Sequence, residues 1–107
     1  MKIPVDNAVR TYELTCLIPV GYTQSELEKI VKDMDALLKK AGAKVKEHEE
    51  WGKKELSYII KREGKAHKEA HYYHWVFTSE PKNIEGIRRQ IKLNDDVLRE
   101  LLVVREE

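Results

Sequence analysis

Two hydrophobic periods follow one another in the first part of the chain. Over residues 11–18 apolar and polar side chains alternate, which predicts a strand with one buried face. The apolar members of this alternation are Tyr12, Leu14, Cys16 and Ile18. Pro19 and Gly21 then interrupt the pattern, so we expect the strand to end there.

A capping box begins the next element. The Thr23 hydroxyl and the Glu26 carboxylate can each bond a backbone N–H that has no partner within a helix. Apolar residues then recur at spacings of three and four, namely Leu27, Ile30, Val31, Met34, Leu37, Leu38 and Ala41. Gly42 can adopt the left-handed conformation that commonly ends a helix. The pattern predicts an amphipathic helix that ends at Gly42.

The middle of the chain predicts two more strands. Residues 43–60 form the second strand, with a bulge near Gly52, because the apolar positions change from odd to even after Trp51. The polar residues 61–68 are predicted to form a long hairpin loop. A third strand follows over residues 70–78.

The last part of the chain predicts a short helix and a fourth strand. Ile84, Ile87 and Ile91 recur at helical spacing, and residues 97–105 are rich in Val and Leu. The complete order of elements predicts an α+β fold, a ferredoxin-like split β-α-β sandwich. In this fold a four-stranded antiparallel sheet, with strands one and three central, carries two helices on one face.

Composition narrows the class of protein. We expect residues 10–107 to form a single domain and residues 1–9 to be a flexible arm. The 20 Lys+Arg and 19 Asp+Glu nearly cancel, so binding to nucleic acid would need a local cluster of charge. Cys16 is the single cysteine and no signal-peptide pattern opens the chain, so we expect a cytoplasmic protein. No apolar run approaches the ~20 residues that cross a bilayer.

Four blocks of sequence occur in an order typical of one family. They are Arg10-Thr11-Tyr12-Glu13, Trp51-Gly52-Lys53-Lys54-Glu55-Leu56-Ser57-Tyr58, the segment from Lys68 to Tyr72, and Leu93-Asn94-Asp95-Asp96-Val97-Leu98-Arg99. Over residues 10–106 the chain resembles the sixth small-subunit ribosomal protein of bacteria, and the Trp51 block is the most specific match. The resemblance implies a structural protein that binds the central domain of 16S ribosomal RNA together with the eighteenth small-subunit protein. Tyr58-Ile59 departs from the Tyr-Pro that is usual in the family.

Residues 51–68 concentrate positive charge. The segment holds six basic and two acidic residues, a formal charge of +4. Each phosphate that a cation neutralises releases counterions, so such a segment suits RNA backbone binding. A solvated loop could have the same composition, and the resemblance favours RNA. We predict RNA contacts through Arg10, Lys53, Lys54, Lys61, Arg62, Lys65, Lys68 and His71.

The third strand is rich in aromatic residues. Alternation places Tyr73, Trp75 and Phe77 on one face of the sheet but does not show whether that face is the core or the surface. An exposed aromatic face could stack on bases or bind a protein. We assign Tyr73, Trp75 and Phe77, with Arg99 of the fourth block, to the partner surface.

Metal and catalytic sites are not expected. His71 and His74 should point to opposite faces of a strand, which leaves His67, His71 and His74 poorly placed to share a metal. The loop after the first strand lacks the Arg with which acylphosphatases of this fold hold phosphate, and no nucleophile lies next to a base. We therefore expect no cofactor and no enzyme activity. The alternative is a regulatory or oligomerising module of the same fold that binds a small ligand or itself.

Overall fold

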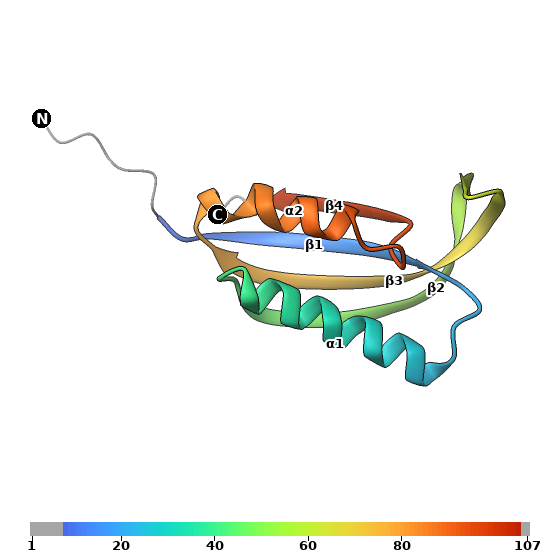
Figure 1. Cartoon of the computed structure of the whole chain (residues 1–107), viewed down its shortest axis with the longest axis horizontal. Helices are drawn as coiled ribbons and strands as arrows, with labels where there is room; N and C mark the ends of the chain where they lie inside the picture. The colour runs from blue at the N-terminus through green and yellow to red at the C-terminus, as the bar shows by residue number, and fades with distance from the viewer. Residues whose placement is uncertain (1–7, 106–107) are drawn as a thin grey trace, which may run out of the picture.

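The computed structural model, which describes residues 8–105, has the predicted order of elements and a four-stranded antiparallel sheet. The elements are β1 (Arg10–Pro19), α1 (Gln24–Lys40), β2 (Lys44–Arg62), β3 (Lys65–Ser79), a 3₁₀ turn (Pro81–Asn83), α2 (Ile84–Lys92) and β4 (Arg99–Val104). The strand order is β2-β3-β1-β4, and both helices cover one face (Figure 1). The α+β ferredoxin-like prediction is confirmed, including the central position of the first and third strands. Residues 1–7 of the predicted arm lie outside the described residues.

The alternation over β1 separates the core from the open face of the sheet. All four predicted apolar residues of this strand are buried against the helices, with Leu14, Cys16 and Ile18 at 0% exposure. Their polar neighbours Thr11, Glu13 and Thr15 are only partly covered and face the opposite side. The period of two therefore predicted both faces of β1 correctly.

The capping box of α1 is formed as predicted. The Thr23 hydroxyl accepts from the backbone N–H of Glu26 at 3.2 Å, and the Glu26 carboxylate accepts from the N–H of Thr23 at 2.8 Å. Along the helix Leu27, Met34 and Leu38 are buried on the sheet. Both ends of the predicted element are thus confirmed, because the chain leaves the helix through Gly42 at a φ of 91°.

The aromatic residues Tyr73, Trp75 and Phe77 of β3 form the centre of the core. Their exposures are 2%, 1% and 0%, and Trp75 donates from Nε1 to Asp35 Oδ1 of α1 at 2.8 Å. The assignment of these three side chains to a partner surface is therefore wrong. Alternation alone did not show which face of the strand is inside, and the burial of these rings under the helices shows that theirs is the core face.

Residues 61–68 are not a loop. β2 continues to Arg62 and β3 starts at Lys65, so the turn consists of Glu63 and Gly64 only. Both have positive φ, 51° and 79°, which matches the right-handed twist of a hairpin. The segment is polar because most of its side chains are exposed, with Arg62 and His67 partly covered. The prediction of a long loop is wrong because polar residues indicate exposure to solvent, and exposed residues can still form strands.

Candidate nucleic-acid interface

The β2–β3 hairpin extends beyond the rest of the sheet. β1 pairs with β3 only as far as Pro19 and Ala70, so β2 is the only neighbour of β3 before Ala70. Figure 1 shows the two strands curling past the end of β1. Five lysines of this hairpin are exposed, namely Lys53, Lys54, Lys61, Lys65 and Lys68. Lys61, Lys65 and Lys68 lie on the part that projects, whereas Lys53 and Lys54 lie where β3 still pairs with β1.

Lys53 and Arg62 of the hairpin have polar partners within the protein. Lys53 Nζ lies 3.9 Å from Glu69 Oε2, and both side chains are about half exposed, so this ion pair is weak. Arg62 donates from Nη1 to the backbone carbonyl of Val97. This bond ties the hairpin to the connection between α2 and β4 and assigns Arg62 a structural role besides its charge.

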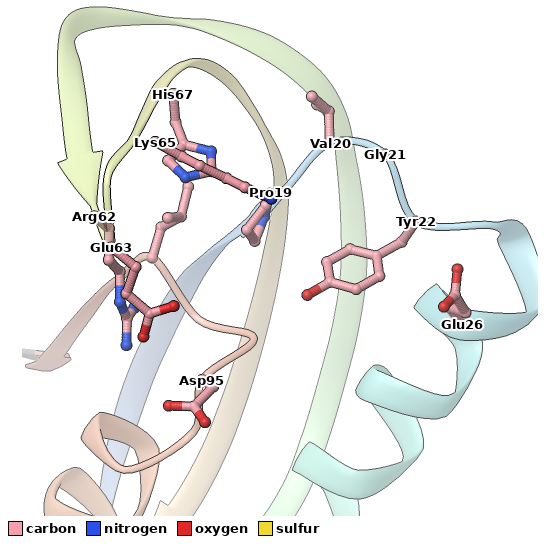
Figure 2. Close-up of a pocket in the computed structure, with 11 residues that line it drawn as sticks. Pro19, Val20, Gly21, Tyr22, Glu26, Arg62, Glu63, Lys65, His67 and Asp95 are labelled. Atoms are coloured by element: carbon pink, nitrogen blue, oxygen red, sulfur yellow. The ribbon is translucent and has the colours of Figure 1, made fainter.

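A pocket of about 490 Å³ lies between the hairpin and the loop that follows β1. Figure 2 shows Arg62 and Lys65 on the hairpin side of this pocket. Three carboxylates share its lining, those of Glu26, Glu63 and Asp95. Carboxylates next to the cations repel phosphate, so the outer surface of the hairpin is the better place for RNA.

Aromatic rings gather on the half of the open sheet face that belongs to β2 and β3. The Trp51 indole stacks on the His74 imidazole with ring centroids 4.4 Å apart and an interplanar angle of 14°. Lys54 Nζ lies 5.8 Å from the centre of the Trp51 ring and 5.6 Å from that of Tyr72. Sequence reasoning placed no side-chain role on Trp51 or Tyr72. The change of phase at Gly52 was the signal, since the bulge between Glu50 and Gly52 accompanies this placement.

Aliphatic residues occupy the other half of the open face, on β4. Leu101 and Val103 are 61% and 44% exposed, and they pair in register with Thr15 and Glu13 of β1. Arg99 is exposed on the same strand, opposite Leu17. Side chains at alternate positions of a strand share a face, so Arg99, Leu101 and Val103 form one strip, which we call the β4 strip.

The structure does not place Arg10 or His71 on the hairpin surface. Arg10 pairs with Ser79 at the opposite end of β1, and at ~3.3 Å per residue it lies about 30 Å from Pro19, where the hairpin leaves the sheet. His71 is half-buried, pairs with buried Ile18, and has an Nδ1 atom without a hydrogen-bond partner among the described residues. Neither residue joins the exposed cations of the hairpin.

The described part of the chain contains neither a metal-binding cluster nor a membrane-spanning helix. No group of three or more His, Cys, Asp or Glu side chains within residues 8–105 is arranged to hold a metal ion. The ring nitrogens of His74 bond Thr15 and Glu13, on the face opposite to that of His71. Over the same residues, no helix has the length and apolar character needed to cross a membrane.

Comparison with known proteins decides the family. The family model described as ribosomal protein S6 matches residues 11–104. The chain belongs to the ribosomal protein S6 family. It is 34% identical over 96 residues to the small ribosomal subunit protein bS6 of Ehrlichia canis, covering 90% of this chain and 84% of that protein. The bS6 of Anaplasma marginale is 38% identical over 88 residues, covering 82% and 77% of the two chains.

The fold agrees with a solved member of the family. The crystal structure of 30S ribosomal protein S6 from Thermotoga maritima superimposes with a TM-score of 0.82 and 19% identity, covering 92% of this chain and 89% of that one. Membership in the S6 family makes the chain a structural protein of the small ribosomal subunit and not an enzyme. The ribosome is therefore its site of action.

Proposed function

We propose that this member of the S6 family binds the central domain of 16S ribosomal RNA in the cytoplasm, together with the eighteenth small-subunit protein. One observation carries the RNA part: the hairpin has five exposed lysines, and three of them, Lys61, Lys65 and Lys68, lie on the part that extends past the end of β1. Projection matters because it lets cations reach phosphates without pressing the folded body against the RNA. Contacts of this kind provide affinity and position, while RNA shape provides most of the selectivity.

The test is a titration of a central-domain 16S RNA fragment at several salt concentrations. Replacing Lys61, Lys65 and Lys68 with Ala should make the plot of log K against log salt less steep by about 2 to 3, since each lost phosphate contact removes roughly 0.7 to 0.9. The matched control replaces Lys32, Lys39 and Lys40, which are exposed on α1. The two triple variants lose the same charge, so an equal effect would mean that net charge and not the hairpin binds the RNA.

The protein partner fits the β4 strip. Exposed aliphatic residues beside a cation provide the apolar centre and polar edge typical of protein interfaces. Leu101→Asp together with Val103→Asp should weaken association with the eighteenth protein by at least tenfold in isothermal titration calorimetry. Leu93→Asp is the control, because Leu93 is 70% exposed at the end of α2. Unchanged association in the β4 double variant would exclude the strip as the interface.

A further inference from the structure

Trp51 presents a flat aromatic surface that other groups hold in place. The indole lies on His74 at 4.4 Å between centroids, and its Nε1 donates to Glu49 Oε2 at 3.0 Å. One side of the ring is therefore covered and its edge is fixed. The residue is nevertheless 40% exposed, so part of the ring remains accessible to a ligand.

The imidazole under Trp51 is itself fixed by β1. His74 Nε2 lies 3.0 Å from Glu13 Oε1, and His74 Nδ1 lies 3.0 Å from Thr15 Oγ1. A carboxylate can only accept, so Nε2 carries a proton and the ring is bound at both nitrogens. Its side chain is 11% exposed, which makes His74 a support for Trp51 and not a ligand site.

The backbone next to Trp51 explains how the ring reaches the open face. Gly52 has a φ of 86°, and the β2–β3 register shifts between Glu50 and Gly52. An extra residue in one strand bends the strand and redirects the side chain at the bulge. Gly52 thus adopts a conformation that L side chains rarely adopt, and this conformation orients Trp51.

A cation completes the arrangement. The Lys54 ammonium lies over the rings of both Trp51 and Tyr72, at 5.8 Å and 5.6 Å from their centroids. Lys54 also belongs to the basic hairpin, three residues beyond Trp51 on β2. A nucleic-acid strand that follows the hairpin lysines would therefore arrive at the exposed indole.

We propose that Trp51 and Tyr72 receive an unpaired nucleobase of the RNA, with Lys54 meeting the adjacent phosphate. Aromatic rings stack on any base whose face is free, whereas a paired base inside a helix offers no free face. The base would stack on the surface of the Trp51 and Tyr72 rings and displace the Lys54 ammonium from it. This inference rests on the proposed RNA binding and adds the class of nucleotide that the open sheet face takes.

The experiment measures the affinity of the central-domain 16S RNA fragment for three variants of the full chain. Trp51→Leu should lower the affinity by about 5- to 150-fold, the range of a lost base–aromatic stack, at every salt concentration and without a change in salt slope. Trp51→Phe should retain most of the affinity because a ring remains. Tyr58→Leu is the control: Tyr58 is an aromatic residue of the same strand that is 64% exposed, and its loss should change little.

Fluorescence gives a second readout that does not depend on a stable Trp51→Leu variant. The chain has two tryptophans, and Trp75 is buried at 1% exposure. RNA should therefore quench the emission of the unaltered chain by stacking on Trp51, and should leave the emission of Trp51→Phe unchanged. The slope change in the hairpin lysine variant tests RNA binding separately, so the two proposals can fail independently.

Three results would overturn the inference. The first is salt-dependent RNA binding by the unaltered chain with no quenching and no loss in Trp51→Leu, which leaves the hairpin proposal standing. The second is a Trp51→Leu variant that loses affinity for the eighteenth protein but not for RNA, which would make the ring a protein contact. The third is the absence of RNA binding by the unaltered chain, which removes both proposals together.

Discussion

Tyr22 donates its hydroxyl to Asp96 Oδ1 at 2.8 Å and so joins two loops that lie 74 residues apart in sequence. One loop leads from β1 to α1, and the other leads from α2 to β4. The second loop also accepts the Arg62 bond from the hairpin. Three connections at one end of the sheet are therefore held together by two side-chain bonds.

Tyr22→Phe should lower the free energy of unfolding by about 1 kcal/mol, because it removes a partly buried hydrogen bond and leaves Asp96 without that donor. Burial and the Asp96 carboxylate raise the pKa of Tyr22 from 10.0 to about 12. The folded state holds the proton more tightly, so this stabilisation is complete below pH 10 and is lost between pH 10 and 12. Urea unfolding at pH 7 and pH 11 measures both effects, and Tyr58→Phe is the exposed control. An equal loss at both pH values would contradict the prediction.

Glu13 should make stability sensitive to acid. The hydrogen bond from Arg105, with a further one from His74, holds the pKa of Glu13 below its ordinary value of 4.5. A lowered pKa stabilises the fold above the ordinary pKa, and this contribution is lost as the pH falls through the folded value. Thermal unfolding between pH 6 and pH 3 should therefore decline less steeply in Glu13→Gln than in the unaltered chain. Glu28→Gln, an exposed change of equal charge on α1, should decline like the unaltered chain.

Cys16 should be inert in the folded protein. Burial raises the pKa of its thiol from 9.0 to about 12, and the side chain has 0% exposure. The reactive thiolate is then both rare and inaccessible near pH 8. Alkylation by iodoacetamide should be at least ~100-fold slower in the native protein than in urea. Mass spectrometry measures this directly, and rapid labelling without denaturant would show that the core opens more readily than its packing implies.

Substitutions in the two-residue turn of the hairpin should change the stability of the protein. Glu63 has a φ of 51°, a conformation that Asn adopts more readily than Glu. Glu63→Asn should raise the free energy of unfolding by a few tenths of a kcal/mol, about 0.5 at most. Gly64→Ala should lower it by about 1 kcal/mol, because Gly64 has a φ of 79°. Both are measurable by urea unfolding, and opposite signs are the expected result.

The elements that were predicted correctly are specified by sequence patterns that span only a few residues. The period of two over β1 and the capping box at Thr23 depend on local spacing alone, and both match the structure. The orientation of β3 could not be predicted in this way. Alternation defines two faces of a strand without indicating which one the helices cover. Only the position of α1, with the bond from Trp75 to Asp35, places Tyr73 and Trp75 inside.

The candidate site was predictable in part. Charge along the sequence located the basic hairpin, since the clustering of lysines needs no knowledge of folding. The stack of Trp51 on His74 joins β2 to β3 through a bulge, and the support from Glu13 comes from β1. Such a site depends on the register of three strands, which no local pattern specifies.

The strand order also determines when the sheet can be completed during synthesis. β1 is made early but lies between β3 and β4, so its hydrogen-bonding edges have no native partner until those later strands exist. Meanwhile a strand with an apolar face would remain open to wrong pairing. One edge of β1 can pair once residues 65–79 have been made, whereas its other edge stays unpaired until residues 99–104 have been added.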